Sequence, residues 1–339
     1  MALSLHRPPA PPPSPGPQPA LSPGLSREPA SIGVGELLGG DELLAWRRSM
    51  LALGGRGADL DWLLDLAGGI PWAALQRLHL SPDRPVRLQR DRAGLEALWR
   101  RHLHTAEPLQ YLVGVCPWRD LELAVAPGVL IPRQETELLV DLARQALARS
   151  SPDCLWADLG TGSGCLAIAL ALALPTSTGL ASDLSADALG QAAVNLERHR
   201  LGGRVQLRSG SWWQALEPWW GLLDLVVANP PYIPSALLHG LDPVVRNHEP
   251  WLALDGGADG LAALRSIVAG AARALAPGGV LLLEHHHDQS AAVLTLLQQA
   301  GLEQGKAHTD LEGVARFAEA RRPLAAGDAA SAQQTGAPT

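Results

Sequence analysis

The sequence predicts an α/β fold, in which a parallel sheet carries helices on both faces, preceded by a smaller all-helical domain. From Asp153 onward, short apolar strands alternate with helical stretches, a pattern typical of a parallel sheet. A glycine-rich stretch follows the first of these strands, as expected where a strand turns tightly into a helix. Between residues 32 and 104, leucines recur at three- and four-residue steps, which indicates helices.

The composition fits a globular protein and argues against some partners. The chain has 339 residues, of which 47% are hydrophobic and 18% charged, enough for one large domain or two ordinary ones. Its formal net charge of −7 and its scattered arginines argue against a nucleic-acid partner. Cys116, Cys154 and Cys165 show neither a close pair nor metal-type spacing, which predicts a reducing, cytoplasmic location. No apolar run is long enough to span a membrane, so no membrane partner is expected.

The first part of the chain divides into an extension and a helical domain. Residues 1–33 are rich in Pro and Ser and lack the apolar core of a secretory signal, which predicts a disordered extension. A transit peptide is the alternative, because the first acidic residue is Glu28. In residues 34–106 glycine pairs interrupt the leucine pattern, which predicts four or five helices. This domain could dock a substrate or simply act as a cap.

The rest of the chain is predicted to form a linker, the α/β domain and a tail. Residues 107–131 show alternating apolar side chains around Pro127-Gly128, typical of a β-hairpin that links two domains. Residues 132–322 are predicted to form the α/β domain, and 323–339 a disordered tail. The strands are expected at 154–159, 180–183, 205–207, 222–228 and 279–284, followed by two closing strands. The helices are expected at 165–174, 185–199, 261–275 and 290–300.

The glycine-rich stretch is the first candidate for binding chemistry. It reads Gly160-Thr161-Gly162-Ser163-Gly164 and follows Asp158. Its glycines allow the backbone to approach a ligand without Cβ clashes. The spacing G-x-G-x-G differs from the dinucleotide pattern G-x-G-x-x-G and suits a nucleoside with a compact charged substituent. A tight strand-to-helix turn would use the same glycines.

Two further strand ends carry candidate residues. Asp183 lies about twenty residues beyond the glycine loop, where a carboxylate can accept both hydroxyls of a ribose. It could also cap the helix that opens at Ser185. After the third strand, Trp212 in Gly210-Ser211-Trp212-Trp213 could flank a purine base, and core packing accounts for it equally well.

The stretch Asn229-Pro230-Pro231-Tyr232 ends the fourth strand. Neither proline has an N–H, and the residue before each proline is held extended, so the ladder cannot continue. The Asn229 amide and the Pro230 carbonyl are therefore free to bond something other than protein. They would lie at the strand ends, where ligands bind in open α/β sheets. A rigid strand-to-loop turn is the alternative.

Together and in this order, these motifs resemble class I S-adenosylmethionine-dependent methyltransferases. Residues 35–320 are similar in particular to the bacterial release-factor glutamine methyltransferases, the HemK/PrmC family. The stretches that carry the narrower resemblance are Pro108-x-Gln110-Tyr111-x-x-Gly114, Leu130-Ile131-Pro132-Arg133-x-Glu135-Thr136-Glu137, the glycine loop, His248-Glu249-Pro250-x-Leu252-Ala253-Leu254-Asp255-Gly256-Gly257 and Asp310-Leu311-x-Gly313-x-x-Arg316.

The resemblance implies a seven-stranded methyltransferase sheet with its last strand antiparallel, and a helical domain that helps dock a class-1 peptide chain release factor. It implies transfer of a methyl group from S-adenosylmethionine to the side-chain nitrogen (N5) of the glutamine in the factor's Gly-Gly-Gln motif, a step in translation termination. The residues implied in the cofactor site are Gly160, Thr161, Gly162, Ser163, Gly164, Asp183, Trp212 and Asn229. The residues implied to hold the substrate glutamine are Asn229, Pro230, Pro231 and Tyr232.

The sequence departs from this family's pattern at three places. Gln134 stands where proline is usual, and Gly210-Ser211 where an acid is frequent. His285-His286-His287 follows Glu284, where a glycine is common. Because side chains alternate along a strand, three adjacent histidines cannot all face one metal ion, so no metal is expected.

A mechanism and two competing functions follow from these residues. We expect the Asn229 side-chain oxygen and the Pro230 carbonyl each to accept one N–H of the substrate amide, while Tyr232 walls the glutamine side chain. An adenine-N6 DNA or RNA methyltransferase uses a similar tetrapeptide, but it needs a basic groove. A non-catalytic nucleoside-binding scaffold would be expected to lose Asn229 or the glycine loop, and both are present.

Overall fold

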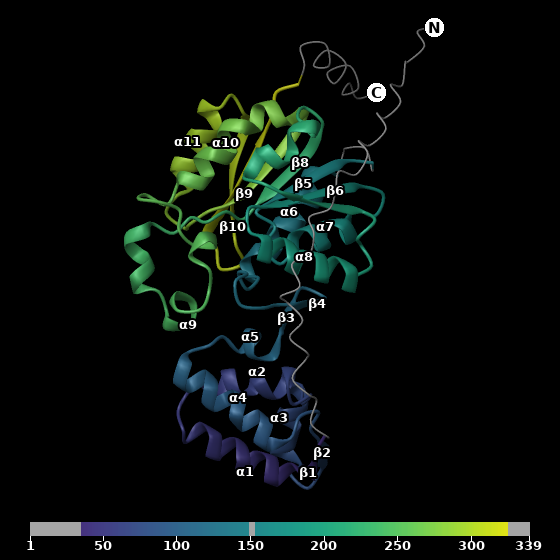
Figure 1. Cartoon of the computed structure of the whole chain (residues 1–339), viewed down its shortest axis with the longest axis vertical. Helices are drawn as coiled ribbons and strands as arrows, with labels where there is room; N and C mark the ends of the chain where they lie inside the picture. Colours follow the sequence, from purple (N-terminus) through teal and green to yellow (C-terminus); the bar gives the residue numbers. More distant parts are fainter. Residues whose placement is uncertain (1–34, 149–152, 325–339) are drawn as a thin grey trace, which may run out of the picture.

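The structure is a computed structural model that describes residues 35–148 and 153–324. It consists of a helical part and an α/β part joined by a short linker (Figure 1). The predicted extension, residues 1–33, and residues 325–339 of the predicted tail lie outside the described residues. Among the described residues, no helix is both long and apolar enough to cross a membrane.

The helical part packs four helices around a common apolar core. Leu60, Leu63 and Leu95 are fully buried there, and the Trp99 ring N–H donates to the Met50 carbonyl at 3.0 Å. A short antiparallel pair, β1 (Leu37–Gly39) with β2 (Pro85–Arg87), lies at its far end; such short strands leave no periodic signal in the sequence. The helices are α1 (Gly40–Leu51), α2 (Gly57–Leu66), α3 (Trp72–Leu80) and α4 (Arg92–Thr105).

The linker contains a shorter hairpin than the span 107–131. The prolines and glycines decide this, because Pro108 opens a short helix, α5 (Leu109–Val113), and Gly114 at φ +82° ends it. The hairpin itself pairs β3 (Val115–Trp118) with β4 (Leu121–Ala124). The chain then reaches η1 (Glu135–Glu137) and α6 (Leu138–Ala146) without further strands.

The α/β part contains a seven-stranded sheet in the order β10-β11-β9-β8-β5-β6-β7. Strands β9, β8, β5, β6 and β7 run parallel, and β11, the last in the chain, is antiparallel to both of its neighbours. The predicted methyltransferase sheet is therefore confirmed. The strands are β5 (Leu155–Leu159), β6 (Thr178–Asp183), β7 (Val205–Ser209), β8 (Leu223–Ala228), β9 (Leu275–Glu284), β10 (Glu303–Thr309) and β11 (Ala315–Arg321).

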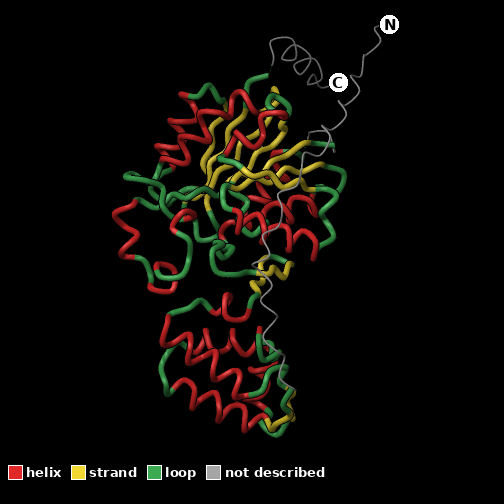
Figure 2. Tube along the Cα trace, in the orientation of Figure 1, coloured by secondary structure: helices red, strands yellow, loops and turns green. Residues whose placement is uncertain are grey.

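Helices cover both faces of this sheet, as the buried apolar strands require (Figure 2). One core layer joins α6, α7 (Cys165–Ala173) and α8 (Ala186–Arg198) to the sheet around Trp156. The other joins η2 (Trp212–Trp219), α10 (Ala262–Ala274) and α11 (Ser290–Gln299) around Val226. The site therefore sits on a rigid three-layer frame.

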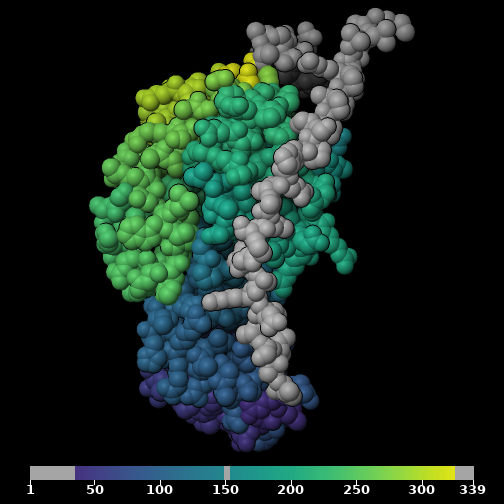
Figure 3. Space-filling model, in the orientation of Figure 1, coloured from purple at the N-terminus to yellow at the C-terminus, as the bar shows by residue number. Residues whose placement is uncertain are grey.

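A further segment between β8 and α10 was not predicted as regular structure. It contains η3 (Ser235–Gly240), α9 (Pro243–Arg246) and η4 (Trp251–Ala253), which are too short to show a helical period. A bridge between Ile233 and Asp255 closes its base. This segment reaches the helical part (Figure 3). There, His248 Nε2 lies 2.7 Å from the Thr105 carbonyl oxygen.

Candidate active site

A cavity of about 260 Å³ lies at the carboxyl edge of the sheet, where the loops that follow β5, β6, β7 and β8 converge. Ligands in open α/β sheets bind at this edge. Residues 128–136 and 250–255 complete the wall. The cavity lining contains these predicted site residues: Gly160, Thr161, Gly162, Ser163, Asp183, Trp212, Asn229 and Pro231.

The glycine loop gives the cavity a wall of bare backbone. Gly160 has a φ of +74° and Gly162 a φ of +56°, in the left-handed region that favours glycine. A Cβ on Gly160 would lie 3.2 Å from the Trp212 ring, so a larger residue would narrow the cavity. The Thr161 hydroxyl donates to Asp158 Oδ2 at 2.7 Å and ties the loop to β5. Burial raises the pKa of the Asp158 carboxyl to about 7.

Gly164 differs from the other predicted loop residues, because it is not part of the cavity lining. Its φ is +83°, and a Cβ there would lie 3.2 Å from the Ala192 side chain of α8. Glycine at this position therefore lets α7 begin close against α8. The geometry accounts for Gly164 by helix packing, and a direct contact with a ligand is not needed to explain it.

Asp183 combines a structural role with a place on the cavity wall. Its Oδ2 accepts from the Gly162 backbone N–H at 2.9 Å, and its Oδ1 accepts from the Ser185 N–H at 2.9 Å. The cap of α8 is Ser185 itself, whose hydroxyl accepts from the Ala188 N–H at 3.2 Å. Each carboxylate oxygen of Asp183 keeps a further lone pair for a ligand hydroxyl. Burial raises the pKa of this carboxyl.

The two adjacent tryptophans after β7 face different surroundings. Trp212 has a φ of +45° and lines the cavity. Trp213 is buried in the core, where its ring N–H donates to the Ile267 carbonyl at 2.8 Å. Core packing therefore explains Trp213, and a ligand's planar ring could lie beside Trp212.

Asn229 and Pro230 keep two acceptors without protein partners. The Asn229 Nδ2 donates to the Thr136 hydroxyl oxygen at 2.9 Å, which orients the amide. Within residues 35–148 and 153–324, neither Asn229 Oδ1 nor the Pro230 carbonyl oxygen takes part in a hydrogen bond. Pro230 is buried and is not part of the cavity lining, and its role stays a prediction.

Tyr232 is not part of the cavity lining, and both its hydroxyl and its carbonyl are held by hydrogen bonds. Its hydroxyl donates to Glu284 Oε1 at 3.1 Å, and its carbonyl accepts from the Gln289 side-chain N–H at 3.0 Å. Burial raises the pKa of the phenol, so it stays a neutral donor. Tyr232 is thus fixed by Glu284, the last residue of β9, and by Gln289, which follows β9.

Three residues of the site, Thr136, Glu284 and Leu184, were not singled out for it by the sequence. Thr136 lines the cavity and donates its hydroxyl proton to Glu284 Oε2 at 2.7 Å. Glu284 is 1% exposed, and burial raises its pKa to about 7. Leu184, next to Asp183, is 59% exposed on the cavity wall. Of these three residues, only Glu284 had a sequence signal that could have found it, as an acid at the carboxyl end of a buried strand.

The residues present fit S-adenosylmethionine. The bare backbone of the glycine loop leaves room for the methionine part, and the free lone pairs of Asp183 suit ribose hydroxyls. Trp212 and the exposed Leu184 offer planar and apolar surface for adenine.

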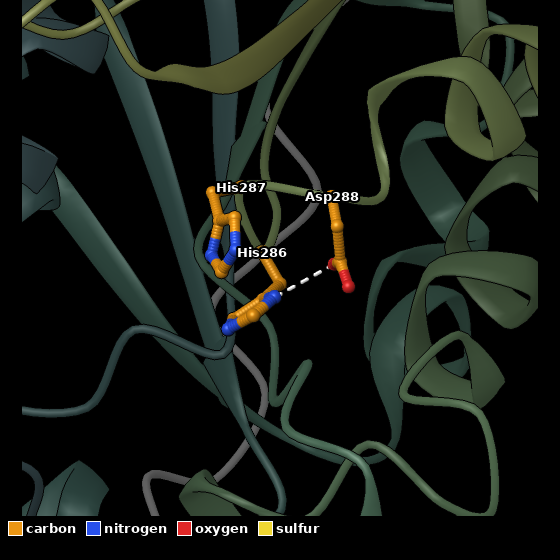
Figure 4. Close-up of side chains that lie close together, drawn as sticks. All are labelled: His286, His287 and Asp288. Atoms are coloured by element: carbon orange, nitrogen blue, oxygen red, sulfur yellow. Dashed lines mark hydrogen bonds and ion pairs between the residues drawn. The ribbon is translucent and has the colours of Figure 1, made fainter.

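The histidine cluster behind β9 lies outside this cavity. His286, His287 and Asp288 bring ligand atoms within 4.8 Å of one another, and His286 Nδ1 lies 2.7 Å from Asp288 Oδ1 (Figure 4). His285 is buried instead, with Nδ1 2.8 Å from the His286 carbonyl oxygen and Nε2 3.2 Å from Ser290 Oγ. His285 therefore does not share a site with His286 and His287. Alternation does not describe these residues, because β9 ends at Glu284 and the adjacent His286 and His287 lie together with Asp288.

Comparisons with known proteins agree with this geometry. The family model of the methyltransferase small domain matches residues 135–239. A release factor glutamine methyltransferase of Prochlorococcus marinus is 50% identical over 84% of this chain and 97% of its own length. One of Gloeobacter violaceus is 46% identical over 71% of this chain and 81% of its own length.

A solved structure shows a similar fold. The catalytic domain of hMettl16, in complex with the MAT2A 3′UTR hairpin 6, has a TM-score of 0.50 and covers 68% of this chain and 82% of its own. At 16% identity, this likeness concerns the fold alone. The identities and coverage of the curated relatives show the family, and the chain belongs to the release factor glutamine methyltransferases.

Proposed function

We propose that this protein transfers a methyl group from S-adenosylmethionine to the side-chain nitrogen of the glutamine in the Gly-Gly-Gln motif of class-1 peptide chain release factors. Membership in the family supports the reaction and the release factor as substrate. The observation that carries the amide as acceptor is the pair of unpartnered oxygens on Asn229 and Pro230 in the described residues. The reaction belongs in the cytoplasm, where translation terminates.

The parts of the chain divide this work. Residues 34–106 dock the release factor, residues 107–131 link the two parts, and residues 132–322 bind the cofactor and catalyse the transfer. The contact of His248 with the Thr105 carbonyl supports this division, because it joins the segment between β8 and α10 to the end of α4. A partner bound to the helical part would therefore contact the same segment that forms part of the cavity wall.

The cofactor side of the cavity positions the donor. S-adenosylmethionine supplies a methyl group already activated by its sulfonium charge, so the protein's task is orientation and electrostatics. Gly160 to Ser163 hold the methionine part along bare backbone, Asp183 accepts from the ribose hydroxyls, and Trp212 lies by the adenine. Asn229 borders both this side and the acceptor side.

The acceptor side must direct a weak nucleophile. An amide nitrogen shares its lone pair with its carbonyl, so it reacts only when it is held and polarised. Asn229 Oδ1 and the Pro230 carbonyl oxygen each accept one N–H of the substrate amide, which aims the nitrogen lone pair at the methyl group. The same two acceptors stabilise the positive charge that develops on nitrogen. Tyr232 walls the glutamine side chain and excludes water.

Labelled S-adenosylmethionine tests this proposal. The purified full-length protein is incubated with a release factor, with the same factor carrying Gln→Ala in its Gly-Gly-Gln loop, and with DNA and RNA of matched concentration. We expect label in the intact factor alone. Label in both factors, or in neither, would overturn the substrate, and label in nucleic acid would favour an adenine-N6 methyltransferase.

A further inference from the structure

The Asn229 side chain is held by a chain of hydrogen bonds between segments far apart in the sequence. Its Nδ2 donates to Thr136 Oγ1 at 2.9 Å, and the Thr136 hydroxyl donates to Glu284 Oε2 at 2.7 Å. Tyr232 donates to the other carboxylate oxygen at 3.1 Å. Asn229 and Thr136 line the cavity and Glu284 does not, so the carboxylate can act only through its neighbours.

A carboxylate decides the direction of such a chain. When ionised, Glu284 can only accept, so the Thr136 hydroxyl turns its proton toward the carboxylate and offers lone pairs to Asn229. A lone pair can be met by the N–H₂ end of an amide and not by its oxygen. The oxygen and N–H₂ ends of the Asn229 amide are nearly equal in size, so the hydrogen bond to Thr136 decides which end faces Thr136. Oδ1 is thereby left for the cavity.

Burying the Glu284 carboxylate costs desolvation free energy, which packing alone does not explain. Its side chain is 1% exposed and has no ion pair within the described part of the chain. Burial is the main reason that its pKa rises to about 7, against the hydrogen bonds from Thr136 and Tyr232. The charged groups that face it are Glu135 of η1, which raises the pKa, and Arg316 of β11, which lowers it. A neutral glutamine of the same size would avoid the desolvation of a carboxylate.

We propose that Glu284, acting through Thr136, is a positioning residue that keeps the Asn229 amide oxygen turned toward the substrate nitrogen; this rests on the proposed function of the cavity. When protonated, Glu284 donates to the Thr136 hydroxyl, which then donates to Asn229 and draws Oδ1 away from the cavity. The Asn229 N–H₂ end would then face the N–H₂ of the substrate amide, and two donors cannot bond. Methyl transfer therefore requires the ionised form.

Paired substitutions at Thr136 test the relay. Thr136→Val keeps the shape of the side chain and removes the hydroxyl, whereas Thr136→Ser keeps the hydroxyl. We expect Thr136→Val to lower kcat about 10- to 100-fold, the loss seen when the hydrogen-bonding partner that orients a metal ligand is removed, which is a comparable orienting role. The KM for the release factor and the calorimetric Kd for S-adenosylmethionine should stay unchanged. Thr136→Ser should retain most of the activity.

The pH dependence tests the carboxylate. In the wild type we expect kcat to rise with pH through an inflection near pH 7, because the ionised form is the productive one. Glu284→Gln should remove that inflection. An activity-independent readout is the ¹⁵N–¹H signal of the Asn229 side-chain amide, which should shift across the same pH range in the wild type and not in Glu284→Gln.

The outcomes separate the relay from the proposed function. If the wild type labels no release factor while the Asn229 signal titrates with Glu284, the relay stands and the substrate is wrong. If the wild type labels the factor, full activity of Thr136→Val or an unchanged pH profile in Glu284→Gln overturns the relay alone. An Asn229 signal that does not titrate overturns it as well. A lower melting temperature in Thr136→Val with unchanged kcat would reduce Thr136 to a structural role.

Discussion

The two halves of the cavity are held in different ways. The cofactor half consists of the loop Gly160 to Ser163 after β5, Asp183 at the end of β6 and Trp212 in the loop after β7, so each part lies close in sequence to the strand that positions it. The acceptor half consists of Asn229 to Tyr232. Thr136 and Glu284 hold its Asn229 and Tyr232 side chains, and Gln289 holds the Tyr232 carbonyl. These partners lie 93, 52 and 57 residues away in the sequence from the groups that they bond.

This difference decides what a substitution can disturb. A change in the cofactor half acts on a local turn and should alter affinity for the cofactor. A change in the acceptor half acts on the aim of one amide and should alter turnover. The two halves share Asn229 and the cavity between them, so each can be probed while the other serves as the internal control.

The largest expected effect is that of Asn229→Ala. Losing the acceptor that directs the substrate amide should lower kcat about 10³-fold, as for other groups that stabilise charge in the transition state. Calorimetry should show nearly unchanged affinity for S-adenosylmethionine, because the glycine loop and Asp183 remain. Near-normal turnover on a release factor would contradict the role of Asn229.

The reciprocal substitution, Asp183→Ala, should act on binding. We expect the Kd for S-adenosylmethionine to rise about 100-fold, or about 2.7 kcal/mol, since two ribose contacts and the bond to the Gly162 N–H are lost. At saturating cofactor, kcat should change far less than in Asn229→Ala. Asp183→Asn keeps an acceptor oxygen but loses the charge, so its Kd for S-adenosylmethionine should lie between those of the wild type and Asp183→Ala. An unchanged Kd in calorimetry would remove Asp183 from the ribose.

A smaller effect is expected from the backbone that supports Tyr232. Gly260 has a φ of +75°, and a Cβ there would lie 2.4 Å from the Tyr232 carbonyl oxygen and 2.5 Å from Gln289 Nε2. Gly260→Ala must therefore shift the tetrapeptide, and we expect kcat to fall about tenfold while cofactor affinity is kept.

Gly301→Ala is the matched control for that change. Gly301 has a φ of +76°, and a Cβ there would meet no atom within 4 Å. Both variants place a side chain at a positive φ, and they differ in that only the Cβ on residue 260 meets Tyr232 and Gln289. Equal kcat values for the two variants would show that these contacts do not position the acceptor half.

The fold and the cofactor half were predictable because their signals are local. Strand–helix alternation placed the strands, and in sequence order Gly160, Asp183 and Trp212 each follow or end one of them. The acceptor half was predicted only as the tetrapeptide itself. Thr136 looks ordinary as an early helix residue, and Glu284 carries only the weak signal of an acid at the end of a buried strand. Only the folded structure brings the two residues to Asn229.

The smallest expected effect is on stability and concerns two buried acids with raised pKa values. Asp158 supports the cofactor half through Thr161, and Glu284 supports the acceptor half through Thr136. Both have a folded pKa raised to about 7 by burial, well above their unfolded values. A raised acid pKa stabilises the fold below the unfolded pKa, and this stability is lost as pH rises through the folded pKa. Each acid should therefore lower the free energy of unfolding by about 1 kcal/mol between about pH 6 and about pH 8.

Chemical denaturation at several pH values measures this loss, and Asp158→Asn and Glu284→Gln should each remove about half of it. The two variants should differ in rate, because only Glu284 is linked to the amide that meets the substrate. Asp158→Asn should keep the rise of kcat near pH 7, whereas Glu284→Gln should lose it. If both variants lost the rise of kcat near pH 7, or both kept it, the two acids would not act separately on stability and on rate. The distinction between the two halves would then be wrong.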